Sequence, residues 1–63
     1  MYIVLFYEEY VGNSVDEYSK IFESKAKANQ YKNKLNKEFA EVNRCKIENL
    51  GDYYIVEEIE KGD

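Results

Sequence analysis

The segment from Tyr2 to Tyr7 is an unbroken run of six apolar and aromatic residues. Alternate side chains of a β-strand point to opposite faces of the sheet, so this run is apolar on both faces. It is too short for a solitary helix and is typical of a central strand that is covered on both sides. Any fold of this chain must therefore cover both faces of its first strand, from within the chain or with a partner.

Two further strands are predicted from residue patterns. A second, more polar strand is expected over residues 16–22, after a turn around Gly12-Asn13-Ser14. By residue type, residues 53–59 form the last strand. With the first strand in the centre, the other two flank it in the spatial order 2-1-3, and the last strand runs antiparallel to the first.

A helix is expected between the second and the last strand. Residues 25–42 contain neither Gly nor Pro and follow Ser24, a candidate N-cap. Apolar residues recur there at helical spacing and form one narrow stripe: Ala28, Tyr31, Leu35, Phe39 and Val42. The element order ββαβ predicts a single α+β domain over residues 1–63, with one helix packed on one face of a three-stranded antiparallel or mixed sheet.

One helix covers only one face of such a sheet, so the other face stays open. Both rows of the first strand are apolar, and the pairing register of the second strand decides which row meets the helix. A two-residue turn at Gly12-Asn13 would set Leu5 opposite Lys20 and Ile3 opposite Phe22. With that register we assign six side chains to the open face as a candidate interface: Tyr2, Val4, Phe6, Ile21, Tyr54 and Val56. A different register would turn some of them inward.

The chain has 63 residues, a lone cysteine, Cys45, and no histidine. A core of this size is marginal, and small domains usually add disulfides, a metal or a partner subunit. We expect no disulfide, no metal site and no cofactor, which leaves self-association as a homodimer or very good packing. A lone cysteine is typical of a reducing compartment, so the expected location is cytoplasmic. The longest apolar run has six residues, too short to cross a membrane.

Enzymatic chemistry has little support in the sequence. Histidine is absent, and no serine has a recognisable base. The acidic pairs Glu8-Glu9, Asp16-Glu17 and Glu57-Glu58 would point to opposite faces of a strand, so their carboxyl groups could not share a proton directly. We therefore expect no catalytic residue.

Positive charge is concentrated in the predicted helix. Five lysines and no acidic residue lie within residues 25–37, so the other residues carry a net charge of −9 to give −4 overall. A helix N-terminus attracts phosphate, and the candidate anion-binding residues there are Ser24, Lys25, Lys27, Lys32 and Lys34. The interpretation that we favour is that these lysines flank the apolar stripe and meet strand carboxylates or solvent.

The chain also has a distant resemblance to known small proteins. A strand that begins at Met1, the junction Phe22-Glu23-Ser24-Lys25-Ala26-Lys27-Ala28 into a helix, and an acidic last strand resemble small ββαβ proteins of bacteriophages and bacterial mobile elements. Several phage inhibitors of host defence are similar in size and in their tyrosine-rich, acidic character. The resemblance implies a dimer that binds a host protein or a nucleotide signal, and it transfers no individual residue role.

These observations predict a non-enzymatic protein-binding module. We expect a phage-type inhibitor or accessory protein that binds and masks a host protein, and that pairs with a second copy of itself. Two alternatives stay open: binding of nucleic acid or a nucleotide by the lysine-flanked helix, and imitation of DNA phosphates by the acidic strands. The negative net charge makes general affinity for nucleic acid unexpected.

Overall fold

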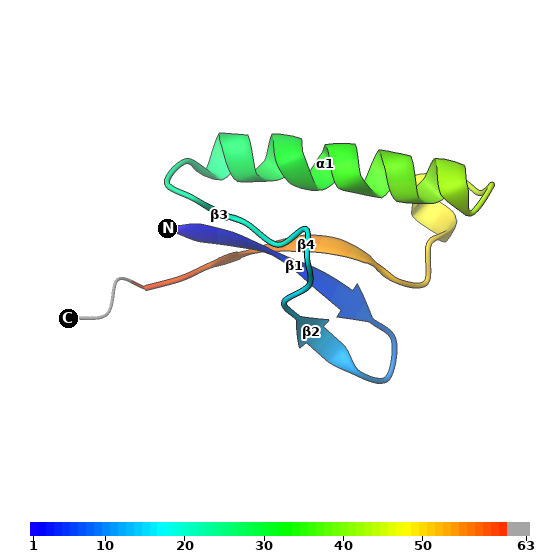
Figure 1. Ribbon diagram of the computed structural model, residues 1–63, viewed down its shortest axis with the longest axis horizontal. Helices are drawn as coiled ribbons and strands as arrows, with labels where there is room; N and C mark the ends of the chain where they lie inside the picture. Colours follow the sequence, from blue (N-terminus) through cyan, green and yellow to red (C-terminus); the bar gives the residue numbers. More distant parts are fainter. Residues whose placement is uncertain (61–63) are drawn as a thin grey trace.

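The computed structural model describes residues 1–60 and has one helix packed on one face of an antiparallel sheet (Figure 1). The predicted α+β class is confirmed. In chain order the elements are β1 (Tyr2–Glu8), β2 (Gly12–Ser14), β3 (Ile21–Phe22), α1 (Lys25–Val42), the short 3₁₀ helix η1 (Ile47–Asn49) and β4 (Tyr53–Glu58).

Strand β1 lies in the centre of the sheet. It pairs with β4 along its whole apolar run, from Tyr2 opposite Glu58 to Tyr7 opposite Tyr53. Strands β2 and β3 therefore share the opposite edge of β1, where β2 pairs with its C-terminal part and β3 with its N-terminal part. The predicted order, with the first strand between the other two, is confirmed, but one flanking strand is split into two short pieces.

The split arises at residues 15–19, which leave the ladder, whereas the Lys20 carbonyl still accepts from the Val4 N–H at 2.9 Å. The Asp16 carboxylate accepts hydrogen bonds from the Tyr18 backbone N–H (3.0 Å) and the Ser19 hydroxyl (3.3 Å), and the Asp16 N–H donates to Ser19 Oγ (3.0 Å). Asp and Ser side chains that satisfy nearby backbone groups compete with strand pairing. The predicted continuous strand over residues 16–22 is therefore wrong, and only Ile21 and Phe22 of it pair with β1.

The hairpin between β1 and β2 turns earlier than expected. Its loop consists of residues 9–11, and Gly12 and Asn13 already belong to β2. The hairpin sets Phe6 opposite Ser14, and the extra residues that leave the ladder between β2 and β3 then bring Ile3 opposite Ile21 and Tyr2 opposite Phe22. The predicted pairing of Ile3 with Phe22 is wrong by one residue, and such a shift exchanges the two faces of a strand.

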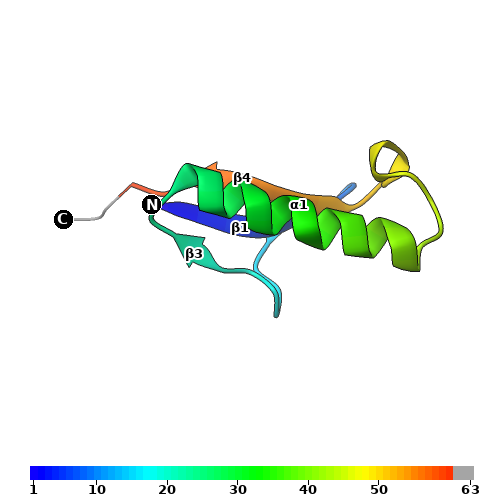
Figure 2. The same ribbon diagram turned by 90° about the horizontal axis from the view of Figure 1, so that it is seen from above.

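Helix α1 has the predicted bounds, and Ser24 is its N-cap, since its hydroxyl oxygen accepts from the Lys27 N–H at 3.4 Å. The helix crosses the sheet at an angle (Figure 2). The core beneath it contains Val4, Ala28, Leu35 and Tyr54, with five partly buried side chains around them: Tyr2, Phe6, Phe22, Tyr31 and Val56. Val42, expected in the apolar stripe, is 80% exposed because the last turn of α1 extends past the strands.

One polar residue takes part in this core. Asn36 is 7% exposed, and its side-chain amide pairs with both backbone groups of Tyr54 in the edge strand β4. Asn36 Nδ2 donates to the Tyr54 carbonyl at 3.0 Å, and the Tyr54 N–H donates to Asn36 Oδ1 at 2.7 Å. We call this pair of hydrogen bonds the Asn36–Tyr54 bridge. It joins the helix to the free edge of the sheet at one residue.

Candidate protein-interaction surface

The sheet face that α1 leaves uncovered is apolar. The β1 side chains that alternate with the core row are Ile3, Leu5 and Tyr7. Their neighbours on this face follow from the strand register, which sets Ile3 beside Ile21, Leu5 beside Ile55 and Tyr7 beside Tyr53. We call this surface the open face; its apolar members are Ile3, Leu5, Tyr7, Ile21, Tyr53 and Ile55.

The open face is not the one expected from the sequence. Of the six predicted interface residues, Tyr2, Val4, Phe6, Tyr54 and Val56 belong to the core beneath α1. Ile21 alone lies on the open face, where it is 56% exposed. The assignment is wrong because both rows of β1 are apolar, so residue types do not distinguish the row that meets α1; the helix packs on the row of Tyr2, Val4 and Phe6. The shifted register of β3 leaves Ile21 on the other face.

The side chains of the open face are neighbours across the strands, as the register places them in opposite pairs. The rings of Tyr7 and Tyr53 lie 5.1 Å apart between centroids, inside the range of a favourable aromatic pair. Ile3, Leu5, Tyr7 and Ile55 are half-buried, whereas Ile21 and Tyr53 are exposed at opposite ends. The surface is therefore continuous and still accessible to a partner.

A polar contact between side chains crosses the open face. Asn13 Nδ2 in β2 donates to Glu57 Oε1 in β4 at 2.7 Å. The β1 partners of these two residues, Tyr7 and Ile3, are four positions apart, so the bond runs diagonally across the sheet. This reach requires a curled sheet, and Figure 1 shows β2 below β1, on the side away from α1. The open face is therefore concave.

The hairpin loop beside the open face carries an exposed aromatic residue. Tyr10 is 98% exposed and has a left-handed backbone, with φ 72°, a region that normally favours Gly or Asn. The loop is held by the hydrogen bond from the Val11 N–H to the Glu8 carbonyl (3.1 Å) and by that from the Glu9 N–H to Asp52 Oδ1 (3.1 Å). These contacts fix Tyr10 pointing into solvent.

The predicted anion site is not assembled into one cluster. The Ser24 hydroxyl oxygen is occupied as the N-cap. Lys25 and Lys32 lie on one flank of α1 and Lys27 and Lys34 on the other, because residues seven apart share a side of a helix. None of these lysines lies within 4.0 Å of a carboxylate oxygen of residues 1–60, so the expected pairing with strand carboxylates is not seen either.

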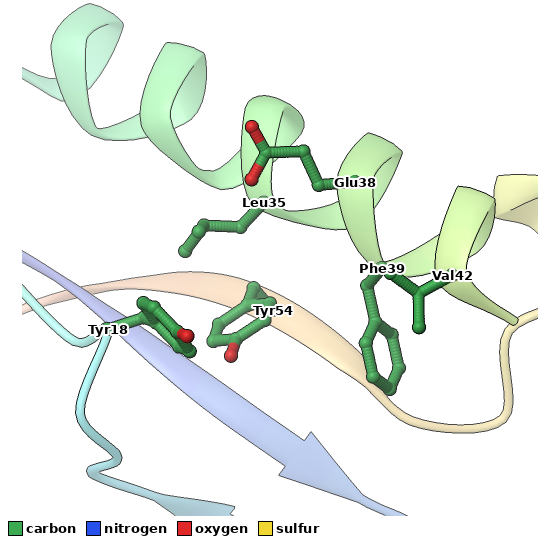
Figure 3. A pocket seen from close by; sticks show the side chains of 6 residues that line it. All are labelled: Tyr18, Leu35, Glu38, Phe39, Val42 and Tyr54. Atoms are coloured by element: carbon green, nitrogen blue, oxygen red, sulfur yellow. The ribbon is translucent and has the colours of Figure 1, made fainter.

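A shallow hollow of about 200 Å³ opens between α1 and the segment before β3 (Figure 3). Its lining is mainly apolar and consists of Tyr18, Leu35, Glu38, Phe39, Val42 and Tyr54. Small-molecule sites usually have about 300–1,000 Å³, so this hollow has room for one side chain rather than a cofactor. No sequence pattern indicates this hollow, because its walls come from a helix, a loop and strand β4.

The hollow contains one perturbed group. The Tyr54 hydroxyl donates to Asp16 Oδ2 at 2.7 Å. Burial, and secondly this hydrogen bond, raise the pKa of Tyr54 well above its usual range. Tyr54 is therefore a neutral donor at physiological pH and is unsuited to act as a base.

Two other kinds of site were sought in the described part of the chain. Within residues 1–60, no three His, Cys, Asp or Glu side chains are grouped so as to hold a metal ion. Over the same residues, the structure has no helix with the length and apolar character needed to cross a membrane.

Comparison of the chain with protein-family models, with curated proteins and with solved structures gave no match.

Proposed function

We propose that this chain is a non-enzymatic protein-binding module that binds and masks a partner protein with its open face. The observation that supports the proposal is the continuous apolar row of Ile3, Leu5 and Tyr7 on a central strand whose other row is already buried by α1. Contiguous apolar surface of this kind on a small domain usually marks an interface. The resemblance to phage inhibitors suggests that the partner is a host protein whose activity is blocked.

A second copy of the chain is one partner that the open face could take. Three strands about 4.8 Å apart and five residues of about 3.3 Å give a patch of about 240 Å² per copy. Burying two such patches contributes about 12 kcal/mol at 25 cal/mol per Å². Association costs about 4–15 kcal/mol, and stable interfaces usually bury at least about 1,200 Å² in total. We therefore propose a weak homodimer rather than an obligate one.

The proposal is tested by sedimentation equilibrium over increasing protein concentration. The wild-type mass should rise from 7.5 kDa toward twice that value. Leu5→Asp should stay monomeric and folded, because it places an unpaired charge in the interface and not in the core. The matched control is Asn33→Asp, which adds the same charge on the exposed side of α1 and should dimerise as the wild type does.

Either of two results would contradict the proposal in part. A wild-type protein that stays monomeric at every concentration rejects the homodimer. A Leu5→Asp variant that associates as well as the control rejects the open face as the surface used. Circular dichroism of each variant shows whether its fold is intact.

The alternative functions have less support. A phosphate ligand would need several lysines on one side of α1, whereas Lys25 and Lys27 lie on different flanks. Binding through phosphate contacts would weaken steeply as salt rises, whereas an apolar protein interface would not. Titration with an oligonucleotide at two salt concentrations separates these possibilities.

A further inference from the structure

The hollow between α1 and the segment before β3 is lined by three aromatic side chains. Figure 3 shows the Tyr18 and Tyr54 rings below Leu35, with the Phe39 ring farther along α1. An apolar cavity of about 150 Å³ can hold a benzene molecule. The volume of about 200 Å³ therefore gives this hollow room for one planar group of similar size.

Negative charge lies both on the rim of the hollow and behind one of its rings. Of the six described residues that line it, Glu38 alone is charged, and Figure 3 shows its carboxylate on the α1 side, above Leu35. The Asp16 carboxylate accepts from the Tyr54 hydroxyl at 2.7 Å. Such a hydrogen bond polarises the phenol and makes the face of its ring more negative. The hollow therefore favours a positively charged occupant over a neutral one.

A contact between a cation and an aromatic ring already exists beside the hollow. The Lys20 ammonium group lies 5.0 Å from the centre of the Tyr31 ring, within the limit of about 6 Å for an attractive contact. The Tyr31 hydroxyl in turn donates to the Tyr18 carbonyl at 2.7 Å. Lys20 is not among the residues that line the hollow, and the Tyr18 side chain is 50% exposed. The Tyr18 ring thus stays accessible to a cation from another molecule.

The shape and chemistry of the hollow suit a guanidinium group better than an ammonium group. A guanidinium group is planar, weakly hydrated and able to stack on aromatic faces, and it can form two parallel hydrogen bonds to a carboxylate. We propose that the hollow receives an arginine side chain of a partner protein. The guanidinium group stacks on the Tyr18 and Tyr54 rings and pairs with Glu38, and the aliphatic stem lies against the exposed side chain of Val42.

A partner protein is a better source of this cation than a free small molecule. Small-molecule sites usually bury about 70–90% of their ligand, and this hollow is shallow. An arginine that is held by a partner gains from the rest of the interface, and arginine is common among the residues that contribute most to protein binding. The hollow lies on the α1 side of the sheet, so the inference adds a contact that does not depend on the open face.

The test uses the full chain, labelled with ¹⁵N, and three capped amino acids. The probe is acetyl-arginine-methylamide. Acetyl-citrulline-methylamide is the matched control, because citrulline has nearly the shape of arginine but no charge. Acetyl-lysine-methylamide carries the charge without the planar group. Backbone amide shifts in the NMR spectrum report where each compound binds, and their concentration dependence gives the dissociation constant.

We expect the arginine compound to shift the amides of Leu35, Glu38 and Phe39, with a dissociation constant in the millimolar range. It should bind about tenfold more tightly than the citrulline compound, because only the charged group gains from the rings and the carboxylate. It should bind about threefold more tightly than the lysine compound, because an ammonium group is more strongly hydrated and does not stack.

Variants of the hollow should weaken binding of the arginine compound while the fold is kept. Glu38→Gln should weaken it about threefold, and Tyr18→Leu about fivefold, since leucine keeps an apolar surface but has no ring. Glu23→Gln and Tyr10→Leu make the same changes at exposed residues that do not line the hollow, and they should leave the dissociation constant unchanged.

Four results would overturn the inference. If the citrulline compound binds as tightly as the arginine compound, the hollow does not select a cation. If the lysine compound binds more tightly, the hollow does not select a guanidinium group. If the arginine compound shifts no amide of the hollow, or if Glu38→Gln and Tyr18→Leu both bind it as the wild type does, the proposed site is wrong. The open face is tested separately by sedimentation of Leu5→Asp, so the two proposals can fail independently.

Discussion

Replacing Asn36 by Ala should remove a large share of the stability of this fold. The substitution deletes both hydrogen bonds of the Asn36–Tyr54 bridge and leaves the Tyr54 N–H and carbonyl groups without their side-chain partner. Each hydrogen bond contributes about 0.5–1.5 kcal/mol net, and a buried group left unpaired costs about 1–3 kcal/mol. Because Tyr54 is only 6% exposed, we expect a total loss of about 2–4 kcal/mol. A domain of this length usually has about 3–9 kcal/mol in all.

The free energy of unfolding would be measured by urea titration followed by circular dichroism. Asn33→Ala is the matched control, because Asn33 is exposed on the same helix and the change brings the same gain of about 0.6 kcal/mol in helix propensity. The difference between the two variants isolates the Asn36–Tyr54 bridge. If Asn36→Ala lies within about 0.5 kcal/mol of Asn33→Ala, the bridge contributes little beyond a surface contact and the argument fails.

The isosteric variant Asn36→Asp tests in which direction the stability of the bridge changes with pH. Its carboxyl group can still accept from the Tyr54 N–H, but once ionised it cannot donate to the Tyr54 carbonyl. Burial and the nearby carbonyl oxygen should raise the pKa of this carboxyl in the folded state. The difference in stability from the wild type should then be smallest below about pH 3.9, which is the pKa of an aspartate carboxyl in the unfolded chain. It should grow as pH rises through the higher pKa of this carboxyl in the folded state. A difference that does not change with pH would refute this account.

Four further outcomes are expected. Tyr54→Phe should cost about 1 kcal/mol through loss of the bond to Asp16. Because the pKa of Tyr54 is raised in the folded state, the contribution of its hydroxyl to the free energy of unfolding is complete below about pH 10 and is lost as pH rises further. Urea titrations of the Tyr54→Phe variant at increasing pH should therefore lack this loss of stability. Tyr10→Asn should raise the melting temperature, since Asn tolerates the left-handed backbone better by about 1 kcal/mol; a lower value would count against strain at this turn. Phe6→Asp should unfold the chain, because the Phe6 ring packs 5.8 Å from that of Phe39 and 5.0 Å from that of Tyr54, and a folded spectrum would contradict its core position. Replacing Lys25, Lys27, Lys32 and Lys34 together by Gln should change the unfolding free energy by less than about 1 kcal/mol, and a larger loss would reveal ion pairs that these lysines make in solution.

The element order could be predicted because each element has a local cause. The run from Tyr2 to Tyr7 indicates a central strand by its residue types alone. Ser24 caps the helix, and the helix continues to Val42 because residues 25–42 contain neither Gly nor Pro. These signals do not depend on distant contacts, so the sequence contains them in full.

The faces of the sheet could not be predicted, because both rows of β1 are apolar and the register of its neighbours depends on the geometry of two loops. Positive φ at a hairpin usually falls on Gly or Asn, and Gly12 and Asn13 stood next to each other as candidates. In the structure, positive φ falls on Tyr10 as well as on Gly12, and the chain turns before Gly12. A Tyr in the left-handed region gives no signal in composition, and the shifted register puts Ile21 rather than Phe22 opposite Ile3.

The role of Asn36 could not be predicted from a sequence pattern either. Asparagine on a helix is usually exposed, and Asn36 is not a member of the apolar stripe predicted for this helix. Its burial depends on where the free edge of β4 passes beneath the helix, which is a contact between segments 18 residues apart. Such a contact appears only when both elements are placed in space.

The pairing of β1 with β4 has a consequence for how the chain is made. Strand β1, the centre of the sheet, is synthesised before its longest partner, β4. The Ile59 N–H bonds to the Met1 carbonyl at 2.7 Å, so the two ends of the described chain close the same ladder. Contacts of such high sequence separation form late, because a large loop must close first. The apolar run of β1 must therefore stay unpaired with β4 until residues 53–58 have been synthesised, so that its apolar residues are exposed to aggregation in the nascent chain for that time.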